Sequence, residues 1–198
     1  MIGSLEIIIY RSFTQSIMNS LTRALLYSAY LWFFAEGMLG PLFAVFSQQI
    51  GGDVLEISWA WATYLIIMGA SIFLVGNLSD KQHMKERLML AGFALNAILT
   101  FCYLLINNPF QLLVLQGGIG LATALAYPTW DALYARYASK KHDGLAWSIA
   151  DGGNNMATGI GMLIGGFIIS YFSFTALFVI MGALQLTGAV IAFVAFNK

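Results

Sequence analysis

Six runs of mostly apolar residues, each about 20 residues long, constrain this chain more than any other feature. A helix of that length crosses the hydrocarbon core of a bilayer, and short polar links separate successive runs. We predict membrane-spanning helices over residues 24–46, 57–78, 87–106, 109–130, 144–170 and 174–196. The sequence therefore predicts an all-α, polytopic membrane protein, with a six-helix transmembrane bundle over residues 21–198.

Charge is scarce along the whole chain. Charged residues make up 9% of the sequence, whereas a soluble domain carries about 25%. Nine basic and nine acidic residues leave no excess of either sign, so the composition argues against nucleic acid as a partner. Cys102 lies within an apolar run and has no second cysteine to pair with in the sequence. We expect no cofactor and no metal site.

The basic residues gather on one side of the predicted spans. Positive charge beside membrane helices is retained in the cytoplasm, so this bias predicts cytoplasmic N- and C-termini in a multi-pass protein of the inner membrane. The three links on the other side carry no Lys or Arg. The basic residues are Arg11, Arg23, Lys81, Lys85, Arg87, Arg136, Lys140, Lys141 and Lys198.

Residues 1–20 form a separate N-terminal segment, apolar but too short and too interrupted to span a bilayer. Leu5, Ile9, Phe13 and Ile17 recur every four residues, which would place them along one face of a helix at the membrane surface. A leader without fixed structure fits the same residues. The segment is thus predicted to be either interfacial or cytoplasmic.

The longest concentration of charge is "GNLSDKQHMKER", residues 76–87, between the second and third spans. Its order resembles the cytoplasmic loop signature of the major facilitator superfamily, G-x-L-(A/S)-D-(R/K)-x-G-x-(R/K)-(R/K). The chain departs from that signature at His83, where the family has glycine, and at Glu86, where it has a basic residue. The resemblance implies a transporter fold made of helical bundles.

Three further stretches support the resemblance over residues 21–196. "GMLGPLFAVF" (37–46) resembles the outer half of the family's first helix, "QGGIG" (116–120) its fourth, and "ATGIGMLIGG" (157–166) its glycine-rich fifth. Leu113 stands where the fourth-helix element has arginine, and Met162 where the fifth-helix element has proline. Both features accompany proton-coupled antiport in the family, so their absence favours facilitated diffusion or symport.

Family members have two six-helix halves, and this chain resembles one of them. The resemblance implies a second bundle, which is either another copy in a parallel homodimer or a separate six-helix half. It also implies that the loop acts as a conformational latch, with its aspartate docked at a helix start of the opposite bundle. We expect Asp131, at the inner end of the fourth span, to pair with Lys81, Lys85 or Arg136. The latch residues are Gly76, Asp80, Lys81, Lys85, Arg87 and Asp131.

Polar groups at membrane depth are the candidate substrate-binding residues, because an uncompensated charge there is unfavourable. Glu36 lies midway along the first span, one turn after Trp32. Asp151 and Asn155 share a face of the fifth span with Ser148. Gln116 lies on the fourth span. Asn96 and Gln185 suit interhelical hydrogen bonds or ligand contacts equally.

The fifth span also carries six glycines, at positions 152, 153, 159, 161, 165 and 166. Small residues at such spacing let membrane helices approach closely, so we interpret these glycines as packing positions. Tyr127 and Trp130, on the fourth span, are interpreted as interfacial aromatics.

The leading functional interpretation is a half-size transporter that moves a small solute, with a proton or cation as a candidate second ligand. The alternative is a non-transporting scaffold or assembly protein, or a truncated remnant that keeps the fold. An enzyme is disfavoured, because the sequence lacks the Gly-rich contexts of intramembrane aspartyl proteases and the motif of membrane serine proteases. No basic residue lies at the depth of Glu36, which favours neutral or cationic solutes.

Overall fold

The computed structural model describes residues 18–81 and 84–197, and within them every regular element is a helix. Three predictions lie outside the described residues. They concern the surface helix within residues 1–17, His83 where the loop signature has glycine, and Lys198. The helices are α2 (Ser20–Leu39), α3 (Leu42–Gln49), α4 (Val54–Ser79), α5 (Met84–Cys102), η1 (Tyr103–Leu105), α6 (Pro109–Tyr137), η2 (Lys140–His142), α7 (Asp143–Tyr171) and α8 (Phe174–Phe196).

Short polar side chains mark where α2, α4, α6 and α8 begin. The Asn19 side chain accepts the Thr22 N–H at the start of α2, over 2.7 Å. Asp53 and Glu56 form a reciprocal capping box at the start of α4. Single side-chain caps precede α6 and α8, where Asn108 accepts the Gln111 N–H and Ser173 accepts the Ala176 N–H. The polar links therefore stop one helix and start the next, which fixes the alternating path of the chain.

The first predicted span is bent rather than continuous. We predicted one helix over residues 24–46, but α2 ends at Leu39 and α3 continues at an angle of 52° to it. Pro41 lies in the break and supplies no N–H for the carbonyl of Gly37, so the regular bonding pattern ends there. The predicted helix over residues 24–46 is therefore interrupted for this local reason, and α2 and α3 together remain a candidate for one bent span.

Four helices in the described part of the chain are long and apolar enough to cross a membrane, namely α4, α5 with η1, α6 and α8. The bent pair α2 and α3 makes a fifth if it is one span. α7 has 29 residues but is not in this group, since polar residues such as Asp151 and Asn154 interrupt its apolar run. The helix positions agree with the predicted spans, while the count of six spans stays a prediction.

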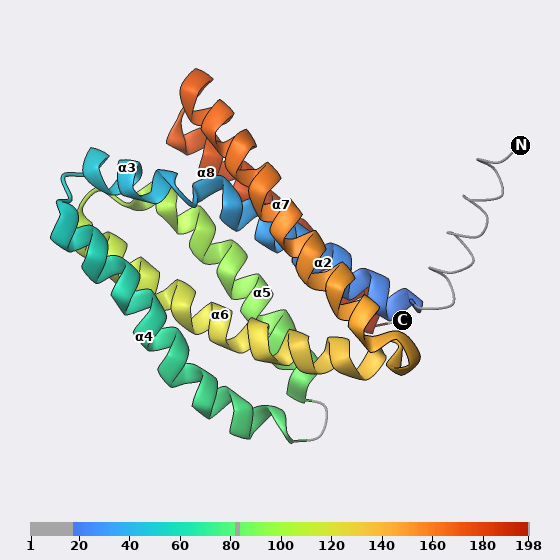
Figure 1. Cartoon of the computed structure of the whole chain (residues 1–198). Coiled ribbons are helices and arrows are strands. Elements are labelled where there is room, and N and C mark those ends of the chain that lie inside the picture. The colour runs from blue at the N-terminus through green and yellow to red at the C-terminus, as the bar shows by residue number, and fades with distance from the viewer. Residues whose placement is uncertain (1–17, 82–83, 198) are drawn as a thin grey trace, which may run out of the picture.

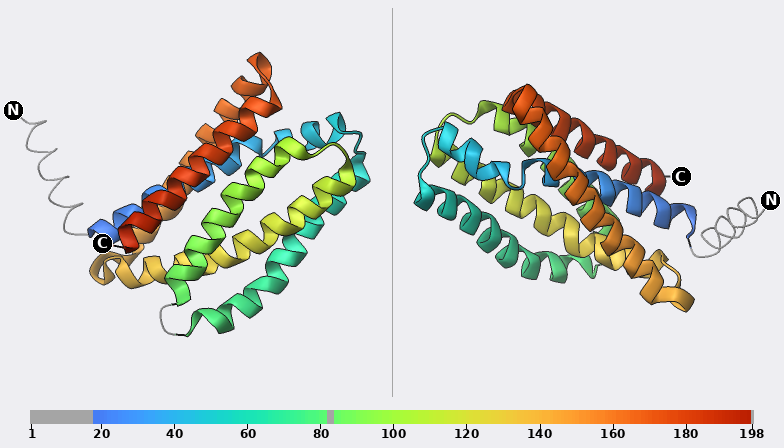
Figure 2. Two further views of the ribbon diagram at one scale, coloured as in Figure 1. Left: turned by 180° about the vertical axis from the view of Figure 1, so that it is seen from behind. Right: turned by 45° about the horizontal axis from the view of Figure 1, so that its top comes forward.

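The helices pack as an open series, with α4 and α7 at its two ends. α4 packs on α6, α6 on α5, α5 on α8, α8 on α2 and α2 on α7. Figures 1 and 2 show α2, α7 and α8 side by side, and α4, α5 and α6 as the adjoining group. The start of α2, the α4–α5 link, the α6–α7 link and the end of α8 lie at one end of the bundle (Figure 1). The described Lys and Arg residues lie in those segments.

Glycines bring α7 against α2, as the sequence predicted for three of the six. A methyl group added at Gly153, Gly161 or Gly165 would collide with Tyr30, Phe34 or Met38 of α2, respectively. Gly152, Gly159 and Gly166 have nothing within 4 Å of that position, so the packing interpretation is not supported for them. One face of α7 thus packs tightly on α2, and another is left open.

Candidate functional site

A polar groove lies between α2, α6 and α7. It encloses about 1090 Å³, part of which is open to solvent, and Glu36 of α2 and Tyr127 of α6 lie on its walls. The other lining residues are Phe33, Gly37, Gly40, Asp151, Asn154, Asn155, Thr158 and Met162. Three of the five predicted substrate-binding residues, Glu36, Asp151 and Asn155, therefore meet in this groove.

α7 contributes polar side chains to one wall of the groove. Asp151 and Asn155 are exposed and one turn apart, and the Asn155 side chain donates to the Asp151 backbone carbonyl over 2.8 Å. The Asp151 carboxylate is left facing outward. Asn154 is buried where it lines the groove, and its Oδ1 has no hydrogen-bond partner among the described residues. The wall offers acceptors that a solute could use.

A second cavity, the inner chamber, lies among the helices of the bundle, with about 540 Å³ of space that is partly open to solvent. Five long helices contribute to it, and Glu36 and Gly40 line both the chamber and the groove. Gln116, the fourth predicted binding residue, is buried, and it lines the chamber but not the groove. The remaining lining residues are Leu39, Phe43, Trp61, Tyr64, Asn96, Thr100, Tyr103, Ile119, Met181 and Gln185.

Gln185 and Asn96, which suited either an interhelical hydrogen bond or a ligand contact, differ in the structure. Gln185 of α8 accepts a hydrogen bond from the Thr100 hydroxyl of α5, so it joins two helices. Asn96 of α5 is 1% exposed, and its Oδ1 has no partner among the described residues. Sequence reasoning missed Trp61, Tyr64 and Tyr103 as chamber residues, because nothing in an apolar run indicates which face of a helix turns inward.

Trp32, the fifth predicted binding residue, is not among the lining residues of the groove or of the inner chamber. It is 6% exposed and packs against Phe93, with ring centroids 4.8 Å apart. Trp130 is also buried, and its Nε1 donates to the Leu25 carbonyl over 2.9 Å. Both indoles belong to the core between α2, α5 and α6. The interfacial interpretation of Trp130 was therefore wrong, whereas Tyr127 is half-exposed on the groove.

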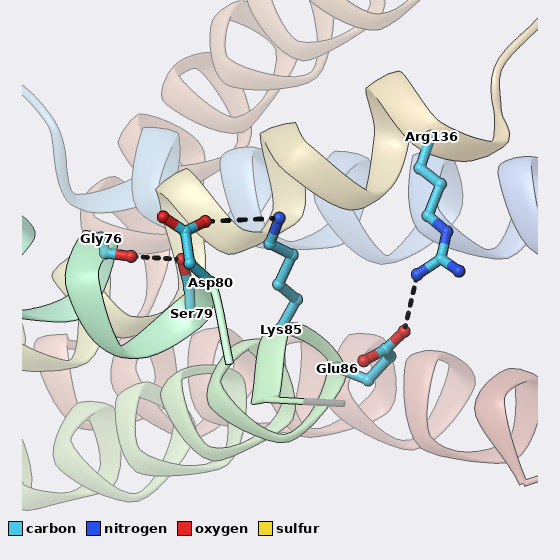
Figure 3. A network of polar contacts seen from close by, with 6 residues as sticks. All are labelled: Gly76, Ser79, Asp80, Lys85, Glu86 and Arg136. Carbon is cyan, nitrogen blue, oxygen red and sulfur yellow. Dashed lines mark hydrogen bonds and ion pairs between the residues drawn. The ribbon is translucent and has the colours of Figure 1, made fainter. Parts of the chain in front are cut away.

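Gly76, Asp80 and Lys85, three of the six residues predicted to form a latch, lie close together at the basic end of the bundle (Figure 3). Asp80, whose side chain is 82% exposed, lies 3.8 Å from Lys85, and the Ser79 hydroxyl donates to the Gly76 carbonyl over 2.9 Å. Arg136 at the end of α6 lies 3.9 Å from Glu86 at the start of α5. Lys81 and Arg87 are exposed.

The cations have partners other than the one that we predicted. Lys85 pairs with Asp80 and Arg136 with Glu86, so neither of these two cations takes Asp131 as its partner. Arg136 turns to Glu86 because the last turn of α6 lies against the first turn of α5. The residue that departs from the loop signature, Glu86, thus ties the two helices together, and half-buried Asp131 remains on the groove side of α6 near Tyr127.

The two cavities share a chemical character. Both contain carboxylate, amide or hydroxyl groups on aromatic and aliphatic walls, and no Lys or Arg of the described chain lines either one. Cavities whose apolar walls carry a few placed polar groups are typical of small-molecule sites. The arrangement suits reversible binding of a small solute that donates hydrogen bonds or carries positive charge.

Comparison with known proteins gives a family match over most of the chain. The family model described as Major Facilitator Superfamily matches residues 25–198. The chain is 21% identical over 168 residues to "Multidrug resistance protein MdtG" of Erwinia billingiae, covering 83% of this chain and 41% of that protein. It is 23% identical over 159 residues to the protein of that name from Dickeya zeae, covering 78% and 39%. The chain thus spans about two fifths of the length of the curated relatives that it matches.

Proposed function

Because the chain belongs to the major facilitator superfamily, a family of membrane transporters, we propose that it forms one six-helix half of a transporter that moves a small solute by alternating access. It is a multi-pass membrane protein. The observation that carries the proposal is the groove between α2, α6 and α7, with Glu36, Asp151 and Asn155 on its walls. A second bundle would close this groove into a pathway.

The open series of helices supports the need for a second bundle. The groove is not enclosed by the bundle, and the outward-facing side of α7 carries Asn155, Gly159 and Met162 at a spacing that lines one face. The second bundle is another copy of this chain in a parallel dimer, or a separate six-helix half. In either case Glu36, Asp151, Asn155 and Gln116 contribute to solute binding, with Glu36 at the centre.

The basic end of the bundle is proposed to face the cytoplasm, because the positive-inside rule places Lys and Arg there. Asp80 and Lys85 are then a latch. Their ion pair is exposed and contributes at most about 1 kcal/mol, so little opposes a change of partner. Gly76, Lys81, Arg87 and Asp131 shape the same surface. Asp80 would dock at a helix start of the second bundle in one state and release it in the other.

The proposed class of solute rests on the residues that line the two cavities and on the names of the similar proteins. No Lys or Arg lines the described cavities, which favours neutral or cationic solutes over anions. The relatives are named multidrug resistance proteins, so amphipathic drug-like molecules are the class to test first. Leu113 and Met162 replace the arginine and proline associated with antiport, which favours facilitated diffusion or symport with a proton or cation.

Transport in reconstituted vesicles tests the proposal. Proteoliposomes holding the full chain, with its second half if one is found, are expected to take up a fluorescent amphipathic cation faster than empty vesicles. Glu36→Gln should lower the uptake rate at least tenfold without changing expression or insertion. Glu56→Gln removes one carboxylate at the far end of α4, and glutamine still serves in a capping box, so this control should transport normally.

Uptake that is indistinguishable from empty vesicles, or equal for the Glu36→Gln and unmodified proteins, would contradict the proposal. With normal folding and insertion, that result would favour the scaffold or remnant alternative. A loss of uptake in the Glu56→Gln control would show that the assay reports stability rather than solute binding.

A further inference from the structure

The inner chamber is built within one bundle and, unlike the groove, without α7. Its residues come from α2, α3, α4, α5, η1, α6 and α8 of one bundle, and α7 contributes none of them. A second bundle is therefore not needed to build it. Only Glu36 and Gly40 are shared with the groove, at the point where the first span breaks.

The chamber holds a hydrogen-bond acceptor without a donor. Asn96 is buried on α5, and its Oδ1 has no partner among the described residues. Its neighbour one turn along, Thr100, already donates to Gln185. Buried polar atoms in native proteins almost always have a partner, so the free Asn96 oxygen points to a donor that enters the chamber from outside.

The walls restrict what that donor can be. Glu36 supplies a carboxylate, and four aromatic rings from three segments surround the space. A carboxylate pairs with a positively charged donor more strongly than with a neutral one, and ring faces attract cations. No Lys, Arg or His of the described chain lines the chamber to neutralise Glu36. The rings are those of Phe43, Trp61, Tyr64 and Tyr103.

We propose that the inner chamber binds a small organic ammonium ion with an aromatic or aliphatic body, wholly within one six-helix bundle. The ammonium group donates to the Glu36 carboxylate and to Asn96 Oδ1, and the body lies among the aromatic rings. The ion reaches the chamber from the groove, past Glu36 and Gly40. This site shares Glu36 and Gly40 with the groove, but binding of the ion there does not require that the chain transports anything.

Equilibrium binding to the full chain in lipid nanodiscs tests the site, with benzylamine as the probe. Benzylamine is protonated at pH 7, and benzyl alcohol has nearly the same shape without the charge. Benzylamine should bind saturably above the level of empty discs, at least tenfold more tightly than benzyl alcohol. Glu36→Gln should remove the difference between the two. Asn96→Leu fills the chamber and should abolish the binding of both.

Trp61→Leu is the second variant, because Trp61 is 51% exposed and its replacement threatens folding less than a change at buried Asn96. It should weaken benzylamine binding several-fold and change benzyl alcohol binding less. Glu56→Gln is the control and should bind like the unmodified chain. Each variant must keep the unfolding midpoint of the unmodified chain and its elution volume in size-exclusion chromatography.

Equal affinities for benzylamine and benzyl alcohol would overturn the proposal, as would unsaturable binding, which would leave only water in the chamber. Strong competition from sodium ions at equal concentration would also overturn it, because it would show that the Glu36 carboxylate and Asn96 Oδ1 bind an inorganic cation instead. Weakened binding in Asp151→Asn, with unchanged binding in Trp61→Leu, would place the probe in the groove. The uptake assay is independent of these outcomes, so either proposal can fail alone.

Discussion

The close contact of α7 with α2 yields a sharp prediction, because two adjacent glycines face opposite surroundings. A methyl group at Gly165 would lie 2.7 Å from the carbonyl carbon of Met38 and closer still to its oxygen. At Gly166 the same group would meet nothing within 4 Å. Ordinary contacts begin near 3.4 Å, so Gly165→Ala must push the two helices apart by at least about 0.7 Å.

The clash involves backbone atoms, which cannot rotate away as a side-chain end can. Overpacking of this kind costs about 1–3 kcal/mol. Gly166→Ala introduces no clash and gains up to about 1 kcal/mol of helix propensity. The free energy of unfolding should therefore fall for Gly165→Ala and stay level or rise for Gly166→Ala, a difference of about 1–4 kcal/mol between neighbouring positions.

Reversible unfolding in mixed micelles, titrated with sodium dodecyl sulfate and followed by circular dichroism, measures both variants. The same pair should differ in solute uptake, since the walls of the groove are set by this contact. Equal unfolding free energies for the two variants would refute the reasoning, because they would show that α7 does not pack on α2 through Gly165.

Three further predictions concern the topology, the break and the buried indole. A cysteine in place of exposed Lys81, with Cys102→Ser as background, should react with an impermeant maleimide in inside-out vesicles and not in intact cells; labelling from outside would reverse the orientation. Pro41→Ala restores an N–H to the break and should raise helix content while lowering uptake, as measured by circular dichroism and the vesicle assay; unchanged uptake would show that the bend has no role. Trp130→Phe removes the hydrogen bond to the Leu25 carbonyl and should cost about 1–3 kcal/mol in the same unfolding titration; a loss below about 0.5 kcal/mol would contradict the burial of Trp130.

The positions of the helices could be predicted from the sequence because apolar runs of about 20 residues and polar caps are local signals. The break at Gly40 and Pro41 has a local cause too, but its angle depends on what α3 packs against. Phe46 of α3 contacts Tyr103 and Phe178, which are distant in sequence. Local chemistry thus gives the place of the bend and tertiary packing gives its size.

The inner chamber could not be predicted, because the rotation of each helix about its axis is not encoded in a run that is apolar all round. Trp32 and Trp61 both occupy apolar runs, yet Trp32 packs in the core and Trp61 lines the chamber. Asn96 illustrates the same limit, since its polarity indicated a contact but not whether a helix or a ligand makes it. The partners of Arg136 and Lys85 also depended on which helix ends meet.

The mass of the protein in membrane discs tests the central claim most directly. Discs cut from the native membrane by a polymer, without detergent, keep any second bundle beside this one. Native mass spectrometry should find either two copies of the chain or one copy with a second six-helix half in each disc. Discs that hold a solitary copy, from membranes that still transport the solute, would contradict the claim that a second bundle completes the groove.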